Sequence, residues 1–154
     1  MTKPIVLFIE LKIAAKSKYV CEITEKLFQS HISTSIYVEG DFTKQIDNML
    51  WTWKQESFIP HKICDTTDAV NGQILICDSL SNLPATQALI LHDPLPLDVL
   101  KKYQLIIDFA EIYHGEKKKD SRARFKQLRD SDEFDIHFTH LGALLSREII
   151  KLNA

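Results

Sequence analysis

Several short apolar runs in the sequence are closed by an aspartate, the residue type that holds magnesium at strand ends in nucleotide hydrolases. Asp78, Asp93 and Asp108 each close such a run. A carboxylate in this position takes part in phosphoryl transfer only together with a lysine and a glycine-rich loop that holds the phosphates. We expect the three aspartates to serve strand ends and turns instead, because the glycines stand singly, at Gly40, Gly72, Gly115 and Gly142.

His137 and His140 are three positions apart, a spacing at which two imidazoles on a helix bind one metal ion. No third ligand stands at a compatible spacing, so surface histidines are the simpler interpretation. The sequence also has no Gly-x-Ser-x-Gly motif and no Ser-His-Asp arrangement. We expect no catalytic residue, no metal and no cofactor. A nucleotide-dependent enzyme is the alternative from another class.

The segment Glu116–Asp130 carries seven basic and three acidic residues, although the whole chain has a net charge of -2. At helical spacing Lys118, Arg122 and Lys126 fall on one face, with Phe125 among them. An arginine binds a carboxylate in a bidentate pair, lysines attract further negative charge, and a phenylalanine borders an apolar pocket. The face therefore suits a short acidic peptide with an apolar end. Phosphate contact, including direct DNA binding, and a purely solvated helix are the alternatives.

Two tryptophans stand close together at the end of another helical pattern. Trp51 and Trp53 are two positions apart, so on a helix they point about 200° apart and cannot both face the core. The apolar spacing aligns Trp53 with the core and leaves Trp51 for the surface, near Phe58 and Pro60. An exposed aromatic cluster of this kind is typical of a protein contact. A loop that folds back and buries Trp51 and Phe58 is the alternative.

These candidate residues must be held by alternating strands and helices. Continuous apolar runs followed by amphipathic segments are typical of an α/β domain with a mostly parallel sheet. We expect a single domain over residues 1–154, with a C-terminal helical tail from about residue 139. The expected strands are 4–9, 35–38, 74–77, 88–91 and 104–109. The expected helices are about 14–30, one after Gly40-Asp41, a short one ending near 102, 116–129 and 139–152.

Length and composition agree with this organisation. The chain has 154 residues, 45% of them hydrophobic and 26% charged, which fits one folded domain. No apolar run approaches the roughly 20 residues that cross a bilayer, and the N-terminal residues lack a secretion signal. We therefore expect a cytoplasmic protein without membrane contact. A protein that coats nucleic acid with its whole surface would be basic overall, so nucleic acid should be reached only indirectly.

Three sequence elements, in this order and at these distances, closely resemble the chi subunit family of bacterial DNA polymerase III. They are Leu50-Trp51 with Glu56–His61, then Leu105–Phe109, then Ser121–Lys126. The resemblance runs from about Ile5 to Arg129. It implies a non-catalytic subunit associated with the clamp loader. It also implies a three-layer sandwich similar to mononucleotide-binding (Rossmann-like) proteins, without a phosphate loop.

The resemblance also implies partners. Chi proteins bind a psi subunit, or an equivalent tether, and the acidic C-terminal tail of the single-stranded-DNA-binding protein. A repair helicase is a further candidate partner of the aromatic residues. Carried over by position, tail binding falls on Lys118, Arg122, Phe125 and Lys126, and psi-like partner binding on Trp51, Phe58 and Pro60. Phe125 stands where the family often has tyrosine, so a hydroxyl contact to the tail would be missing.

Overall fold

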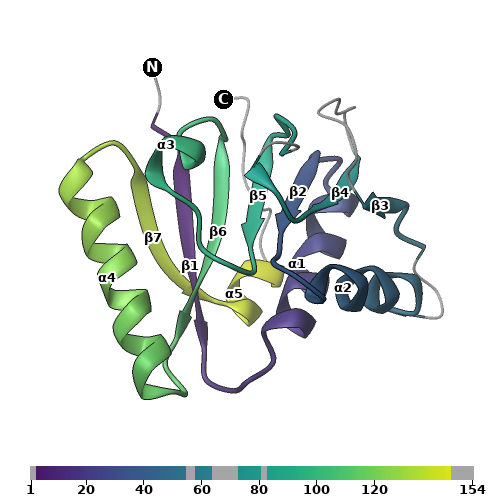
Figure 1. Ribbon diagram of the computed structural model, residues 1–154, viewed down its shortest axis with the longest axis horizontal. Helices are drawn as coiled ribbons and strands as arrows, with labels where there is room; N and C mark the ends of the chain where they lie inside the picture. The colour runs from purple at the N-terminus through teal and green to yellow at the C-terminus, as the bar shows by residue number, and fades with distance from the viewer. Residues whose placement is uncertain (1–2, 55–57, 64–72, 81–82, 147–154) are drawn as a thin grey trace.

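The apolar runs of the sequence form the central strands of a parallel sheet in the computed structural model, which describes residues 3–54, 58–63, 73–80 and 83–146 (Figure 1). The elements follow one another as β1 (Ile5–Leu11), α1 (Lys16–Gln29), β2 (Thr34–Tyr37), α2 (Phe42–Trp51), β3 (His61–Ile63), β4 (Ile74–Cys77), β5 (Ala88–Leu91), α3 (Leu97–Leu100), β6 (Leu105–Glu111), α4 (Gly115–Ser131), β7 (Asp135–His140) and α5 (Leu141–Ser146). The sheet has seven strands in the order β3-β4-β2-β5-β6-β1-β7.

Helices cover both faces of the sheet, which explains why its central strands are buried without alternation. Every residue of β2, β4, β5 and β6 is buried. Along β1, Ile9 and Leu11 pack in the core layer beneath α1, α2 and α5. Val6 and Phe8, which point to the other face, pack in the layer beneath α3 and α4. The predicted α/β class and three-layer sandwich with a parallel sheet are confirmed.

Two edge strands, β3 and β7, were not expected from the sequence. β7 is mostly exposed, with Ile136 and Thr139 half-buried, so it lacks the apolar run that marks the central strands. It is held by parallel pairing with β1, and the Asp135 N–H donates to the Pro4 carbonyl at 2.9 Å. The last described helix consequently begins at Leu141 instead of residue 139. Residues 147–152 of the expected helix lie outside the described residues.

The topology places α4 and α2 at opposite ends of the sheet. α4 packs on β6, next to β1 and β7, whereas α2 packs on β3 and β4. Figure 1 shows the two helices well apart, α4 on the left and α2 on the right. Any surfaces that these helices carry are therefore separate. None of the described helices is long and apolar enough to span a membrane.

Candidate functional site

Helix α4 is short of apolar residues, so polar contacts have a large part in holding it on the sheet. Among its described residues Ser121 and Leu128 are the buried ones. The Ser121 hydroxyl oxygen accepts a hydrogen bond from the Glu111 N–H at 3.1 Å. His114 caps the N-terminus of the helix, because its Nδ1 accepts a hydrogen bond from the Lys117 N–H at 3.4 Å. The helix ends at Ser131 and is followed by Asp132, which has the left-handed conformation (φ 54°) common after helices.

Arg124 joins α4 to strand β6. Its Nε and Nη2 atoms donate to the two carboxylate oxygens of Asp108 at 3.0 and 3.2 Å, and Nη2 also donates to the Phe109 carbonyl at 3.1 Å. Burial lowers the pKa of Arg124, but the nearby carboxylates of Asp108, Glu111 and Asp120 outweigh it and raise the pKa above its usual range. Asp108, expected at a strand end, is thus an internal partner of a helix arginine. The charge of Arg124 is used within the protein.

A small apolar cavity opens between α4 and the strands β1, β6 and β7. Its volume is about 160 Å³, and it is lined by Phe8, Ala110, Ile112, Lys118, Ser121, Arg122, Phe125 and Phe138. The ring centroid of Phe8 lies 5.8 Å from that of Phe125 and 5.5 Å from that of Phe138. The Phe125 and Phe138 centroids are 4.9 Å apart. We call this site the tail cavity.

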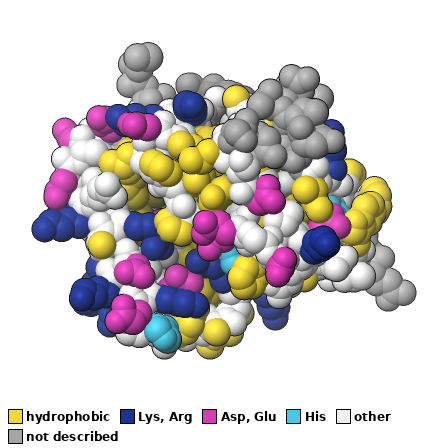
Figure 2. Space-filling view, in the orientation of Figure 1, with side chains coloured by type: hydrophobic (Ala, Val, Ile, Leu, Met, Phe, Trp, Pro, Cys, Tyr) yellow, Lys and Arg dark blue, Asp and Glu magenta, His cyan; other side chains and the backbone are white. Residues whose placement is uncertain are grey.

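The predicted basic residues border the tail cavity unequally. Arg122 and Lys118 line it, and Arg122 is exposed while Lys118 is half-buried. Lys126 is exposed on the same helix but does not line the cavity. None of the three forms an ion pair with an acidic side chain among the described residues. Figure 2 shows Lys and Arg side chains over α4, with acidic side chains between them.

The sequence pattern did not identify two walls of the tail cavity, Phe8 and Phe138. Phe8 carries a detectable signal, since the continuous apolar run of β1 predicts a strand buried on both faces. Phe138 carries none, because its position depends on the pairing of β7 with β1. The structure therefore adds to the predicted site an aromatic wall that spacing along one helix cannot reveal.

The predicted aromatic residues lie at the end of α2 and before β3. Trp51 is 54% exposed and Phe58 is 68% exposed, and Pro60 is also exposed. The ring centroids of Trp51 and Phe58 are 5.9 Å apart. Trp53 is half-buried and packs against the core as expected, although α2 ends at Trp51 and Trp53 follows the helix. We call Trp51, Phe58 and Pro60 the aromatic patch.

The buried ring of His61 packs against Trp51 of the aromatic patch. Its side chain is fully buried, and Nδ1 lies 2.7 Å from the Ile59 carbonyl oxygen. Nε2 lies 3.1 Å from a carboxylate oxygen of Asp47 on α2. The His61 ring centroid is 4.7 Å from that of Trp51. The exposed tryptophan thus rests on a ring that is itself fixed at both nitrogens.

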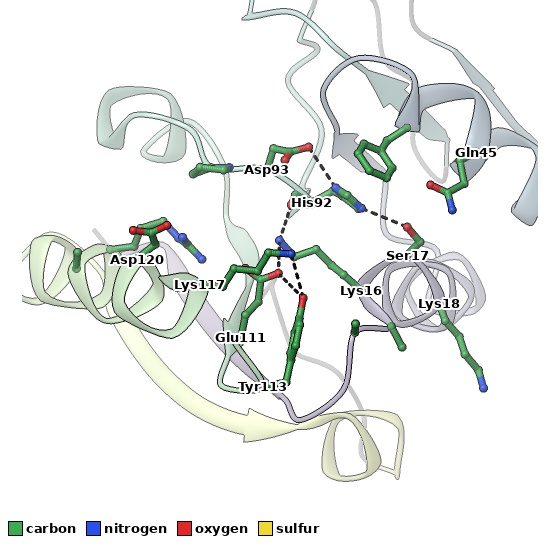
Figure 3. A pocket seen from close by; sticks show the side chains of 16 residues that line it. Lys16, Ser17, Lys18, Gln45, His92, Asp93, Glu111, Tyr113, Lys117 and Asp120 are labelled. Atoms are coloured by element: carbon green, nitrogen blue, oxygen red, sulfur yellow. Dashed lines mark hydrogen bonds and ion pairs between the residues drawn. The ribbon is translucent and has the colours of Figure 1, made fainter. Parts of the chain in front are cut away.

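A larger cavity, of about 720 Å³, lies at the carboxyl ends of β1, β5 and β6, where ligands bind in many open α/β sheets (Figure 3). Lys16 forms an ion pair with Glu111 at 3.0 Å and donates to the His92 carbonyl at 2.7 Å. The His92 ring lies between Ser17 Oγ, at 3.2 Å, and Asp93 Oδ2, at 3.1 Å. Burial lowers the pKa of His92, although Asp93 opposes this effect.

The polar groups of this larger cavity are engaged mainly with one another. The turn before α1 contains Ala14 and Ala15 instead of glycines, so it offers no phosphate loop. The described residues contain no group of three or more histidine, cysteine, aspartate or glutamate side chains that could hold a metal ion. His137 lies 3.1 Å from Asp135, and His140 accepts the Ala143 N–H at the start of α5.

The fold and the sequence were each compared with known proteins. The chain superposes on the crystal structure of T4 UvsW with a TM-score of 0.63 and 12% identity, over 90% of this chain. It covers 42% of that chain, so it spans less than half of the length of UvsW, and the likeness concerns the fold alone. A search of curated proteins finds no match. The sequence model of the DNA polymerase III chi subunit, HolC, matches residues 1–134.

Proposed function

The chain belongs to the DNA polymerase III chi subunit family, and from this membership we propose that it connects the polymerase to two protein partners. One partner is the acidic C-terminal tail of the single-stranded-DNA-binding protein, bound at the tail cavity. The other is a psi-like subunit, bound at the aromatic patch and tethering the chain to the clamp loader. The chain itself performs no catalysis in this role, and it acts in the cytoplasm.

The observation that supports tail binding is an apolar cavity with unpaired cations at its border. A peptide that ends in an apolar residue places that side chain against Phe8 and Phe125, where its burial is favourable. Its carboxylates then meet Lys118 and Arg122, and Lys126 attracts the acidic residues that precede the end. An apolar cavity beside the charged residues is not expected if the helix is merely solvated, so it favours peptide binding over that alternative.

The observation that supports a psi-like partner is the exposure of Trp51 and Phe58 on a rigid base. Large aromatic side chains bury much area on binding while few rotamers are lost. His61 already fixes the position of Trp51, so little ordering is required when a partner covers it. Because α2 and α4 lie at opposite ends of the sheet, one chain can hold both partners at once.

Calorimetric titration of the full chain with a synthetic C-terminal peptide of the single-stranded-DNA-binding protein tests the proposal. We expect micromolar affinity, which corresponds to about -8 kcal/mol, and weaker binding as salt rises. A peptide of the same composition in scrambled order is the control. A bare oligonucleotide is titrated in parallel. Absence of peptide binding at low salt, or tighter binding of the oligonucleotide, would contradict the proposal.

A further inference from the structure

We propose that Phe138 is a specificity-determining residue of the tail cavity, one that sets how strongly the cavity selects the apolar end of an acidic peptide. The inference rests on the proposed function, because it assigns a role within the same site. Phe138 lies on β7, beyond the residues 1–134 that the family model matches. This chain therefore supplies the wall from a strand outside the matched region.

The pairing of β7 with β1 determines where the Phe138 ring stands. The two strands are parallel, and Phe138 is the register partner of Phe8. Neighbouring partners on adjacent strands point to the same face of a sheet, and here that face is the one covered by α4. A slip of one residue would place His137 in this position and remove the ring from the cavity. The register thus brings three rings, from β1, α4 and β7, around one small space.

The exposure of Phe138 distinguishes it from a core residue. It is 59% exposed although it touches two other rings, whereas Phe8 is fully buried and Phe125 is half-buried. One side of the Phe138 ring therefore completes the cavity wall while much of its surface stays in contact with water. An apolar group that enters beside Phe125 would cover part of that surface and gain the burial.

Phe138 also adds no charge to a border that already carries Lys118 and Arg122. The cations attract any acidic segment, regardless of what side chain ends it. Selection for an apolar end must come from the apolar walls, which are Phe8, Ala110, Ile112, Phe125 and Phe138. Of these, Phe8 and Phe125 also pack within the core layer, while Phe138 is the most exposed and contributes its surface mainly to the cavity.

The test compares the unchanged chain with Phe138→Thr, which replaces the ring with a β-branched residue of high strand propensity. Two peptides are titrated: the C-terminal tail of the single-stranded-DNA-binding protein, and the same peptide with its last residue replaced by alanine. Phe138→Thr should weaken binding of the natural tail peptide about 5- to 10-fold and binding of the alanine-ended peptide less than 2-fold. The salt dependence of binding should stay unchanged. Phe42→Thr is the matched control, because Phe42 is 49% exposed and lies at the larger cavity.

Two outcomes overturn the inference: no loss for the first peptide, or an equal loss for both. In either case the unchanged chain still binds the tail, and the proposed function stands. If the unchanged chain binds neither peptide, the proposed function itself fails. Should Phe138→Thr unfold by circular dichroism, Phe138→Leu takes its place. Leucine should then lower the selection between the two peptides by a smaller factor, and an unaltered selection would refute the role.

Discussion

Arg124 on α4 and Asp108 on β6 form a nearly buried bidentate ion pair, with nitrogen to oxygen distances of 3.0 and 3.2 Å. The aspartate side chain is 5% exposed and the arginine side chain 20% exposed. The same arginine also donates to the backbone of β6. The pair therefore determines how a helix with few apolar residues sits on the sheet, and with it the position of the tail cavity.

The ion pair predicts a stability effect. Arg124→Met leaves the carboxylate of Asp108 buried without its partner, so the free energy of unfolding should fall by about 3 kcal/mol. Replacing both residues, as Arg124→Met with Asp108→Leu, removes the orphaned charge and should restore much of the loss. Urea denaturation followed by circular dichroism measures both. If the single and double variants lose the same amount, the pair does not act as described.

A second prediction concerns the charge at the tail cavity. Arg122→Ala should weaken binding of the tail peptide by about 2 kcal/mol. It should also reduce the salt dependence of that binding, because a cation at the border of the cavity is lost. Lys44→Ala, an exposed cation on α2, removes the same charge far from the cavity and is the control. Calorimetry at two salt concentrations gives both quantities. Equal affinities for the Arg122 variant and the unchanged chain would reject the site.

A third prediction separates the two surfaces. Trp51→Ala should weaken binding of a psi-like subunit by about 2 kcal/mol or more while tail binding is unchanged, because the aromatic patch lies at the other end of the sheet. Trp51→Phe keeps a ring over His61 and should lose less. Co-purification with the candidate subunit, followed by calorimetry, measures the effect. Loss of tail affinity in the same variant would show that the surfaces are not independent.

A fourth prediction follows from His92, which is 7% exposed and whose pKa is lowered by burial. An unfolded histidine binds a proton below a pH of about 6.5, whereas the folded His92 resists it. The unfolded state then binds more protons, so stability should fall as the pH drops below that value, by at most about 1.4 kcal/mol per pH unit. His92→Gln should have a flatter profile between pH 7.5 and 5. Identical slopes for both proteins in thermal unfolding would contradict this assignment.

The central part of the fold could be predicted because burial leaves a direct mark on the sequence. Strands such as β4 and β5 are covered on both faces, so nearly every residue in them is apolar. The edge strands leave no such mark. β7 has polar side chains at most positions, and only its backbone pairing with β1 makes it a strand. Local patterns carry no information about a partner strand more than a hundred residues away.

The same distinction between local and long-range features applies to the candidate site. Exposure of Trp51 and the shared face of Lys118 and Arg122 follow from the geometry of a single helix, which spacing describes well. The partner of Arg124 was missed, because Asp108 reads locally as a turn residue and its role depends on a helix packed from elsewhere. The tail cavity itself depends on β1, β6, α4 and β7 at once. Spacing within any one of them could not reveal it.

The position of β1 between β6 and β7 also has a consequence for biosynthesis. Both edges of β1 can be paired only after residues 105–111 and then 135–140 have been synthesised. Phe8 consequently lacks its ring neighbours Phe125 and Phe138 until those later residues have been synthesised, and the cavity that the three rings line is incomplete until then. The cavity that we propose binds the tail therefore forms only after β7 has joined the sheet.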